Sequence, residues 1–288
     1  MSRDARRVLM WERLGSRAMR KCILITGAGS GFGRDAALAL AANGHDVIAA
    51  VHHPAQVAEV QDAAAARGHP VRVEKLDLLS EDDRQAAFDW DIDVLVNNAA
   101  IGEGGPIAEI PLELVRRVFD VNVFATLALT QGIVRRMVQR GRGRIIFVSS
   151  IAGLTAGAYL GAYAASKHAL EAIAESMANE LAPYGIQVAT LNPGPYGTGF
   201  NDQMVRSRDR WYDPARNFTR PEHMAALDER FEKQFDPARL VRAMVELAQS
   251  EAGLYRNVHP QESERLVRER QRDAWTRTQS TPAGDQGM

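Results

Sequence analysis

The feature of this sequence that most constrains its fold is a repeated alternation of short apolar runs with longer helix-like stretches. The apolar runs cover 21–26, 46–51, 71–76, 93–98, 144–150 and 186–192. They are apolar throughout and lack the alternation of polar and apolar positions that marks a half-exposed strand. Strands of this kind belong in a parallel sheet that helices cover on both faces. With right-handed crossovers, the pattern predicts a doubly wound α/β domain of three layers.

Helix-like stretches separate the apolar runs along the chain. They are expected over 33–44, 54–68, 81–89, 111–140, 161–182 and 236–250. No linker divides the chain, so the sequence predicts a single domain over 21–260. Within this domain, the stretch 199–235 mixes aromatic, methionine and charged residues without a clean period, and 254–260 is a short candidate for a seventh strand.

The two ends of the chain differ from this pattern. Residues 1–20 are rich in arginine and lack the continuous apolar core of a signal peptide. Three interpretations are open: a poorly ordered extension, an amphipathic targeting segment, or a gene start assigned too early, with Met19 as the true first residue. We expect the first. The charged tail 261–288 is predicted to carry a surface helix over 262–275 and to be disordered after Thr281.

Composition and charge exclude several classes of protein. The net charge of −1 gives no electrostatic basis for binding nucleic acid or an anionic membrane. No apolar stretch approaches the ~20 residues that a membrane span needs. Cys22 is the single cysteine, so it cannot form an internal disulfide, and its apolar surroundings favour a buried thiol. We expect a cytoplasmic protein that acts on a small molecule and carries no metal.

A glycine-rich turn joins the first apolar run to the first helix. The stretch TGAGSGFG at 26–33 places Thr26, Gly27, Gly31 and Gly33 in the pattern T-G-x-x-x-G-x-G. Glycines here let the backbone turn tightly and approach a pyrophosphate, while the following helix directs its free N–H groups at that anion. The turn predicts a nucleotide site, and the alternative is a glycine-rich turn without a ligand.

This spacing resembles that of the short-chain dehydrogenase/reductase family, and the resemblance runs from about Lys21 to Phe200. The stretches LD at 76–77, NNAA at 97–100 and PGPYGT at 193–198 resemble family motifs in the family's order, although Ala100 replaces a glycine. The resemblance implies a Rossmann-type fold and a nicotinamide cofactor, with Asp77 at the adenine and Thr198 at the carboxamide. The implied cofactor site comprises Gly27, Ser30, Gly31, Phe32, Gly33, His52, Asp77, Leu78, Asn98, Ala99, Tyr163, Lys167, Pro193, Gly194 and Thr198.

Tyr163 and Lys167 stand four positions apart in an alanine-rich stretch, so they share one face of the expected helix. A tyrosine with its ordinary pKa of about 10 is a poor base at neutral pH. An ammonium within ~4–6 Å favours the phenolate, so we expect Lys167 to lower the pKa of Tyr163. The compact ammonium suits this position better than a guanidinium, because it can also hold ribose hydroxyls. The alternative is an interfacial tyrosine beside a solvated lysine.

Ser150 and Asn122 complete a tetrad with this pair, as the resemblance implies. Ser150 matches the family serine that hydrogen-bonds the substrate oxygen, whereas the rival Ser149 is expected to point to the other side of the strand. Asn122, in FDVNVFA at 119–125, resembles the family's helix-kinking asparagine, which holds a water that links the lysine to bulk solvent. The alternatives are a capping serine and an asparagine satisfied by its own backbone.

The choice between NAD(H) and NADP(H) depends on the end of the second apolar run. Family members that prefer NAD carry an acidic residue there, whereas this chain has Val51, His52 and His53. A carboxylate would repel a 2′-phosphate, and Arg34 adds positive charge after the glycine turn. We therefore favour NADP(H) over NAD(H), and the alternative is that both histidines are solvated loop residues.

Residues 199–235 take the place of the family's substrate-covering segment. Its apolar side chains favour a largely apolar substrate, or else they hold the segment onto the domain or onto a partner subunit. These side chains are Trp211, Tyr212, Phe218, Met204 and Met224. Arg206, Arg208 and Arg210 suit an acidic substrate, although a run of charges usually forms a solvated face. The resemblance also favours a homo-oligomer, either a dimer or a tetramer.

The sequence therefore favours an NAD(P)-dependent oxidoreductase that interconverts a secondary alcohol and a ketone or aldehyde carbonyl. In reduction, Ser150 and Tyr163 would hold the carbonyl oxygen, Tyr163 would supply the proton, and Lys167 would take part in its return. One alternative is a catalytically silent nucleotide-sensing or scaffold protein, which would usually have lost the tyrosine or the lysine. Another is an isomerase or epimerase of nucleotide sugars, which fits less well because that branch carries the motif G-x-x-G-x-x-G.

Overall fold

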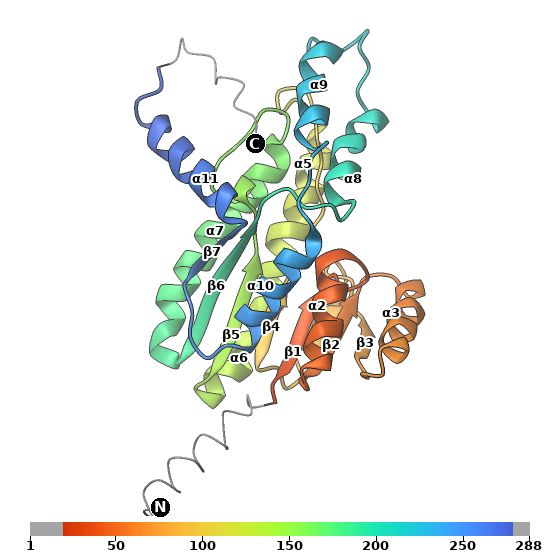
Figure 1. Ribbon diagram of the computed structural model, residues 1–288, viewed down its shortest axis with the longest axis vertical. Helices are drawn as coiled ribbons and strands as arrows, with labels where there is room; N and C mark the ends of the chain where they lie inside the picture. The colour runs from red at the N-terminus through yellow and green to blue at the C-terminus, as the bar shows by residue number, and fades with distance from the viewer. Residues whose placement is uncertain (1–19, 279–288) are drawn as a thin grey trace, which may run out of the picture.

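Seven parallel strands form one sheet in the computed structural model, which describes residues 20–278 (Figure 1). The strand order is β3-β2-β1-β4-β5-β6-β7. The strands are β1 (Cys22–Thr26), β2 (Asp46–Val51), β3 (Arg72–Lys75), β4 (Val94–Asn97), β5 (Gly143–Val148), β6 (Ile186–Pro193) and β7 (Arg256–His259). The direction of winding reverses between β1 and β4, so a ligand crevice is expected at the carboxyl ends of these two strands. The predicted Rossmann-type fold is confirmed, including the short seventh strand.

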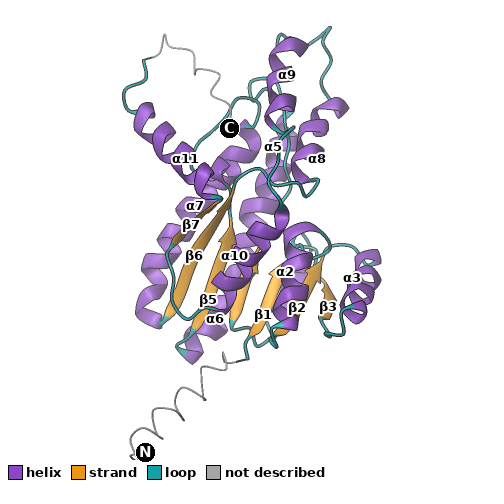
Figure 2. Cartoon of the chain, viewed as in Figure 1, coloured by secondary structure: helices purple, strands orange, loops and turns teal. Residues whose placement is uncertain are grey.

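Helices cover both faces of the sheet (Figure 2). One face packs against α2 (Gly31–Ala42), α3 (Ala55–Ala66) and α10 (Pro237–Gln249), and the other against α4 (Glu81–Ala87), α6 (Thr126–Arg140) and α7 (Gly161–Leu181). Side chains on successive positions of β1 belong to opposite layers: Leu24 faces the second group of helices, while Ile23 and Ile25 face the first. All three are fully buried, and such burial contributes roughly 1.5–3 kcal/mol for each side chain.

The helical stretch expected over 111–140 is interrupted. It consists of α5 (Leu112–Phe119), a π-helical turn (Asp120–Ala125) and α6, which ends at Gly141 in the left-handed conformation with φ 67°. A π-turn widens the helix by one residue and leaves its hydrogen bonding out of step with the α-helices on either side. The expected stretch is thus helical along its length, and its irregular turn contains Asn122, the residue that resembles the family's helix-kinking asparagine.

Two further groups of helices extend beyond the carboxyl ends of the strands. Figure 1 shows α8 (Phe200–Arg206) and α9 (Pro221–Arg230) on one side and α11 (Gln261–Ala274) on the other. Short 3-10 turns cover Ile151–Gly153, Ala182–Tyr184 and Ser207–Arg210. The stretch 199–235, which has no clean period in the sequence, thus forms short helices joined by a turn and a loop.

The ends of the chain are only partly described. Helix α11 lies where the sequence predicts a surface helix over 262–275. The predictions for 1–19 and for disorder after Thr281 lie outside the described residues. Among residues 20–278, no helix combines the length and the apolar character that crossing a membrane requires.

Candidate active site

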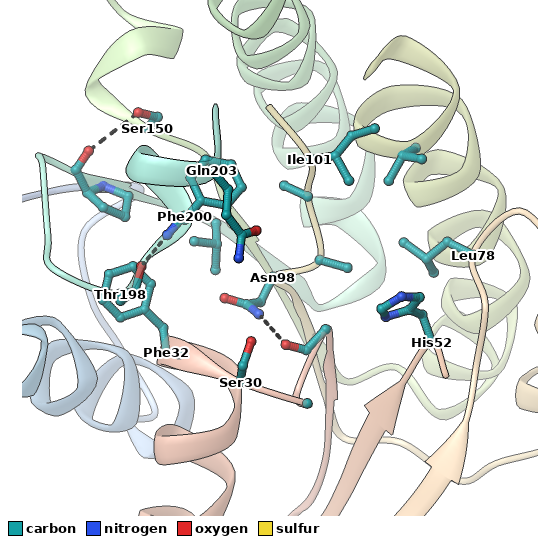
Figure 3. Close-up of a pocket in the computed structure, with 18 of the residues that line it drawn as sticks. Ser30, Phe32, His52, Leu78, Asn98, Ile101, Ser150, Thr198, Phe200 and Gln203 are labelled. Carbon is teal, nitrogen blue, oxygen red and sulfur yellow. Dashed lines mark hydrogen bonds between the residues drawn. The ribbon is translucent and has the colours of Figure 1, made fainter. Parts of the chain in front are cut away.

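A cavity of about 480 Å³ lies at the carboxyl ends of β1 and β4. Figure 3 shows His52 and Leu78 at one end of it and Ser150, Thr198 and Phe200 at the other. With one exception, the residues of the predicted cofactor site line this cavity. They are Gly27, Ser30, Gly31, Phe32, His52, Asp77, Leu78, Asn98, Ala99, Tyr163, Lys167, Pro193, Gly194 and Thr198. The structure therefore brings together segments that are far apart in the sequence.

The glycine turn forms the floor of the cavity. Its backbone conformation and close contacts require glycine at several positions. Gly27 and Gly31 have φ values of 66° and 54°, which side chains rarely adopt. A Cβ atom at Gly27 would lie 2.7 Å from the Cα atom of Ala99. At Gly33, the exception to the lining, a Cβ would lie 2.7 Å from the carbonyl oxygen of Gly27, so this glycine serves the packing of α2. The turn thus leaves an open cradle at the start of α2, which suits a phosphate group.

Thr26 and Asn98 hold the turn against the end of β4. The buried Thr26 hydroxyl oxygen accepts hydrogen bonds from the backbone N–H groups of Asn98 and Ala99, at 3.0 and 3.1 Å. The Asn98 side-chain amide donates to the carbonyl oxygen of Thr26 at 2.9 Å and to that of Gly27 at 3.3 Å. These bonds fix the ends of β1 and β4 relative to each other, and so they fix the width of the cradle.

Tyr163 and Lys167 lie in the first turns of α7 and are both buried, with exposed fractions of 8% and 2%. The Lys167 Nζ atom is 5.7 Å from the centre of the Tyr163 ring. It donates a hydrogen bond of 2.8 Å to the carbonyl oxygen of Val148, the last residue of β5. The helical spacing thus places the ammonium beside the phenol, as predicted, and the backbone of β5 holds it there.

Burial dominates the titration of both groups. It raises the pKa of Tyr163 to about 12, and the hydroxyl of Ser150 opposes this shift only in part. It lowers the pKa of Lys167 to about 8, against the opposing charge of Glu171. The prediction of a lowered pKa for Tyr163 is therefore wrong for this structure, because burial raises the pKa by more than the hydrogen bond with Ser150 lowers it. At neutral pH the phenol carries its proton.

Ser150 is the second residue after β5 and occupies the cavity wall next to Tyr163. Its hydroxyl accepts a hydrogen bond of 3.0 Å from the backbone N–H of Ala152 and lies 3.5 Å from the carbonyl oxygen of Pro193 (Figure 3). Its rival Ser149 also lines the large cavity, but the Ser149 hydroxyl lies against Gly153, where a Cβ atom would approach it to 2.6 Å. Ser150 additionally borders a smaller cavity beyond Tyr163. Both cavities thus meet at Ser150.

Asn122 lies behind the cavity wall, in the π-turn, with an exposed fraction of 1%. Its side-chain oxygen accepts from the N–H of Ile101 at 2.9 Å, and its amide donates to the Ile101 carbonyl oxygen at 2.8 Å. The same amide donates to the Ser166 hydroxyl at 3.0 Å. The side chain therefore fastens the loop after β4 to α7, which is a positioning role and not contact with a ligand.

The charges at the other end of the cavity are few. His52 lines the cavity, whereas His53 uses its Nδ1 atom to accept from the N–H of Ala55 at 3.2 Å. The Asp77 carboxylate accepts from the N–H of Leu79 at 3.0 Å. Arg34, expected to add charge near the glycine turn, instead pairs with its neighbour Asp35 at 3.1 Å. His52, directly after the second apolar run, thus reaches the site.

Several lining residues were missed by sequence reasoning. Arg117 of α5 adds a cation to the cavity wall, and Gln56 of α3 covers Gly29, where a Cβ would lie 2.3 Å from its amide nitrogen. The rings of Phe200 and Tyr163 are 5.6 Å apart, so the covering segment begins directly over the phenol. No local motif marks these positions, because each reaches the cavity through tertiary packing.

The apolar side chains of the covering segment mostly hold it in place. Met204 is 2% exposed and borders the smaller cavity. Met224 is buried, Trp211 packs on Gly105, and the Tyr212 hydroxyl donates to the carbonyl oxygen of Thr219 at 2.6 Å. Phe218 is 76% exposed. Of the five side chains predicted to favour an apolar substrate, only Met204 borders either of these cavities.

The sequence offered three arginines as binding groups for an acidic substrate, and two of them form ion pairs with carboxylates of the protein. Arg208 pairs with Asp228 at 2.7 Å, and Arg210 pairs with the buried Glu103 at 2.6 Å. Arg206 is exposed at the end of α8. These three residues stabilise the segment or face solvent.

Comparison with known proteins agrees with this arrangement. A family model described as short chain dehydrogenase matches residues 21–209. The chain is 38% identical over 186 residues to the uncharacterized oxidoreductase YusZ of Bacillus subtilis (strain 168), a match that covers 62% of this chain and 66%, just under two thirds, of YusZ.

Two solved structures extend the comparison to the cofactor. A short chain dehydrogenase/reductase from Burkholderia phymatum in complex with NAD superposes with a TM-score of 0.77 at 25% identity, covering 93% of this chain and 99% of that one. A putative NAD(P) dependent gluconate 5-dehydrogenase from Beutenbergia cavernae, with NADP bound at low occupancy, superposes with a TM-score of 0.68 at 30% identity, covering 81% and 92%. Proteins of this architecture thus bind either dinucleotide.

Proposed function

The chain belongs to the short-chain dehydrogenase family, and from this premise we propose that it interconverts a secondary alcohol and a ketone or aldehyde carbonyl with NAD(P) as the hydride carrier. One observation carries the proposal. Tyr163, Lys167 and Ser150 line the same cavity as the glycine cradle at Gly27 and Gly31. A dinucleotide held at the cradle and extending along the cavity therefore ends beside a proton donor and a hydroxyl.

The cavity residues fit a nicotinamide dinucleotide in shape and charge. The open cradle at Gly27 and Gly31 would hold the pyrophosphate, and Asp77 and Leu78 would meet the adenine end. Thr198 lies across from the cradle, 3.5 Å from where a Cβ of Gly31 would stand, and would hold the carboxamide. When bound, the nicotinamide would supply the hydride in reduction and accept it in oxidation.

The protein's own groups manage the substrate oxygen and its proton. In reduction, Ser150 donates a hydrogen bond to the carbonyl oxygen, and the neutral phenol of Tyr163 gives that oxygen its proton. Lys167, held by the Val148 carbonyl, stabilises the phenolate that remains. In oxidation, the phenolate takes the proton back from the alcohol. The raised pKa of Tyr163 keeps the proton on the phenol at neutral pH, which is the form that the reduction step uses.

The positioning role of Asn122 supports the same reaction. By fastening Ile101 to Ser166, it keeps the loop after β4 next to the helix that carries Tyr163 and Lys167. A bound water that links Lys167 to solvent would then be held by the backbone of the π-turn, since both side-chain N–H donors of Asn122 are already used.

We further propose that NADP(H) is preferred over NAD(H). The support is His52, which lines the cavity at the position where a carboxylate would repel a 2′-phosphate. A His52→Asp variant should shift the ratio of kcat/KM values toward NADH by about tenfold, since a like charge is then placed beside the phosphate. Steady-state kinetics with both cofactors measure this ratio, and an unchanged ratio would place the selectivity elsewhere. A cytoplasmic location and a homo-oligomer stay predictions.

The proposed reaction is tested with a panel of aldehydes, ketones and alcohols and each of the two cofactors. Oxidation of the reduced nicotinamide, followed by its near-ultraviolet absorbance, is expected with at least one class of carbonyl compound. Tight cofactor binding without turnover of any member would instead favour the nucleotide-sensing alternative.

A further inference from the structure

A buried carboxylate lies behind the reacting groups, at Glu171 of α7. Glu171 follows Lys167 by four positions, as Lys167 follows Tyr163, so the three side chains share one face of the helix. Glu171 is 6% exposed, and the proposed reaction steps do not use it. A buried carboxylate is costly unless it is paired and hydrogen-bonded, so the partners of Glu171 show what it does there.

Side chains from two neighbouring strands hold this carboxylate. The amide of Asn192, on β6, donates a hydrogen bond of 2.6 Å to the Oε1 atom of Glu171. Arg256, on β7, donates to the Oε2 atom at 3.2 Å, and its side chain is 40% exposed. Glu171 therefore meets a neutral donor in the interior and a cation that reaches toward the surface.

Asn192 links the carboxylate to Ser150. Its amide also donates to the carbonyl oxygen of Ser150 at 3.2 Å, and its side-chain oxygen accepts from the hydroxyl of Thr190 at 3.0 Å. Asn192 and Thr190 are both fully buried. Only the nitrogen of an asparagine side chain can donate to a carboxylate, so these bonds fix its orientation. One side chain thus connects Glu171 on α7 to the backbone of Ser150.

Glu171 also places a negative charge one helical turn from the Lys167 ammonium. That ammonium donates its hydrogen bond to a neutral group, the Val148 carbonyl, and lies beside the neutral phenol of Tyr163. Burial lowers the pKa of Lys167 to about 8, and the charge of Glu171 opposes this shift. Without that charge the ammonium would lose its proton at a lower pH.

The elements packed around Lys167 bring few other ionisable groups to it. β6 and the 3-10 turn Ile151–Gly153, which both pack on α7, carry none. The π-turn carries Asp120, which is exposed, and Arg256 of β7 faces Glu171. The pKa of Lys167 responds to Glu171. Beyond the tetrad, the titratable side chains that line the large cavity are His52, Asp77, Arg117 and Tyr196.

We propose that Glu171 is a positioning residue of the reaction, which keeps the Lys167 ammonium charged and, through Asn192, holds the backbone of Ser150 against α7. The inference rests on the function proposed above and adds a residue to its machinery. Asn122 fastens α7 to the loop after β4, whereas Glu171 fastens the same helix to β6 and β7. The serine and the tyrosine–lysine pair are thereby held as one unit.

The titration of Lys167 tests this inference without turnover. The chain has only four lysines, so nuclear magnetic resonance of protein labelled with ¹³C at the lysine Cε atoms gives few signals, and Lys167→Arg identifies that of Lys167. Glu171→Gln keeps the size and an acceptor oxygen but removes the charge. We expect the titration of Lys167 to move to lower pH by about one unit. An unchanged titration would overturn the inference.

The pH profile of carbonyl reduction gives a second readout. In Glu171→Gln, kcat should begin to fall about one unit lower than in wild type and should be about fivefold smaller at pH 8. Glu171→Asp keeps the charge and should restore the wild-type profile in part. A kcat lowered equally at every pH would mean a purely structural role for Glu171 and would contradict the inference. A shifted Lys167 titration in a protein that turns over no substrate would overturn the proposed reaction alone.

Two control variants separate the charge of Glu171 from its contacts. Arg256→Gln breaks the same ion pair but removes a cation, so the titration of Lys167 should stay in place or move to higher pH. Glu175→Gln makes the same substitution at an exposed position one turn further along α7, where water screens the charge, and should change nothing. Arg256→Gln keeps the inference testable if Glu171→Gln does not fold, because a Lys167 titration that this variant moves to lower pH would contradict it.

Discussion

The cofactor cradle and the substrate-covering region of this molecule are built on opposite principles. The cradle at Gly27 and Gly31 depends on backbone conformations that side chains rarely adopt. The covering region, formed by residues 199–235 and α11, depends on contacts between side chains, such as the pair that Arg210 forms with Glu103. A required backbone conformation limits which residue types can stand at particular positions of the sequence. A stabilising side-chain contact, in contrast, can be made by many different sequences. The two regions should therefore respond differently to substitution.

The largest expected effect lies where the two regions meet, at Tyr163. A Tyr163→Phe variant keeps the ring that packs 5.6 Å from Phe200 but removes the proton donor. We expect kcat to fall by about a thousandfold, within the range of general acid catalysis, with the cofactor dissociation constant almost unchanged. Turnover and fluorescence titration of the cofactor measure the two quantities. A rate close to that of wild type would remove the tyrosine from the mechanism.

The next largest effect is expected in the cradle, where a pair of variants distinguishes backbone strain from the loss of contact with the cofactor. Gly31→Ala puts a methyl group into the cavity at a φ of 54°. We expect cofactor binding about tenfold to a hundredfold weaker, because the phosphate loses its close approach to the backbone. Gly44→Ala is the matched control, since Gly44 has a φ of 88° and a Cβ there would meet no atom within 4 Å.

The control should lose about 1 kcal/mol of stability through the same strain and keep its cofactor affinity. Equal losses of affinity in both variants would show that strain, rather than contact with the ligand, explains the effect at Gly31.

The third prediction concerns pH and follows from the burial of Lys167. Its pKa of about 8 means that the ammonium loses its proton above that pH, while Tyr163, with a pKa of about 12, keeps its own. The rate of reduction should therefore fall as pH rises above about 8, by up to about tenfold per pH unit. A pH profile of kcat/KM measures this fall.

Lys167→Arg serves as the comparison for the pH profile. An arginine keeps its charge throughout this range, so the variant should be slower but should show no fall near pH 8. A wild-type profile that stays flat to pH 10 would mean that the charge of Lys167 does not limit the reaction.

The smallest expected effect belongs to the covering region. Arg210 donates to both carboxylate oxygens of the buried Glu103, at 2.6 and 2.8 Å. Because the Arg210 side chain is 63% exposed, Glu103→Gln should cost only about 1 kcal/mol in the free energy of unfolding. Substrate KM should rise a few-fold as the segment loosens. Urea titration and kinetics test this, and a cofactor affinity reduced as strongly as in Gly31→Ala would remove the distinction between the two regions.

The sequence predicts the sheet and the cradle well for physical reasons. Fully apolar runs identify strands that are buried on both faces, as in β1 and β4, and the positions of Gly27 and Gly31 follow from a turn that excludes side chains. The spacing of Tyr163 and Lys167 likewise follows from helix geometry.

What the sequence could not supply is the outcome of competing tertiary effects. The direction of the Tyr163 pKa shift depends on burial against the hydrogen bond with Ser150, and neither magnitude is visible in a motif. The π-turn at Asn122 depends on hydrogen bonds to Ile101, which lies in a distant loop. The run at Arg206, Arg208 and Arg210 is likewise mostly paired internally, because Asp228 and Glu103 reach it from other parts of the chain.

The central claim is that one cavity joins the cradle to the proton donor, and a crystal structure with NADP(H) bound tests it most directly. The account predicts the pyrophosphate at Gly27 and Gly31 and the nicotinamide beside the hydroxyl groups of Tyr163 and Ser150. A dinucleotide bound away from the glycine turn, or a nicotinamide out of reach of Tyr163, would contradict it.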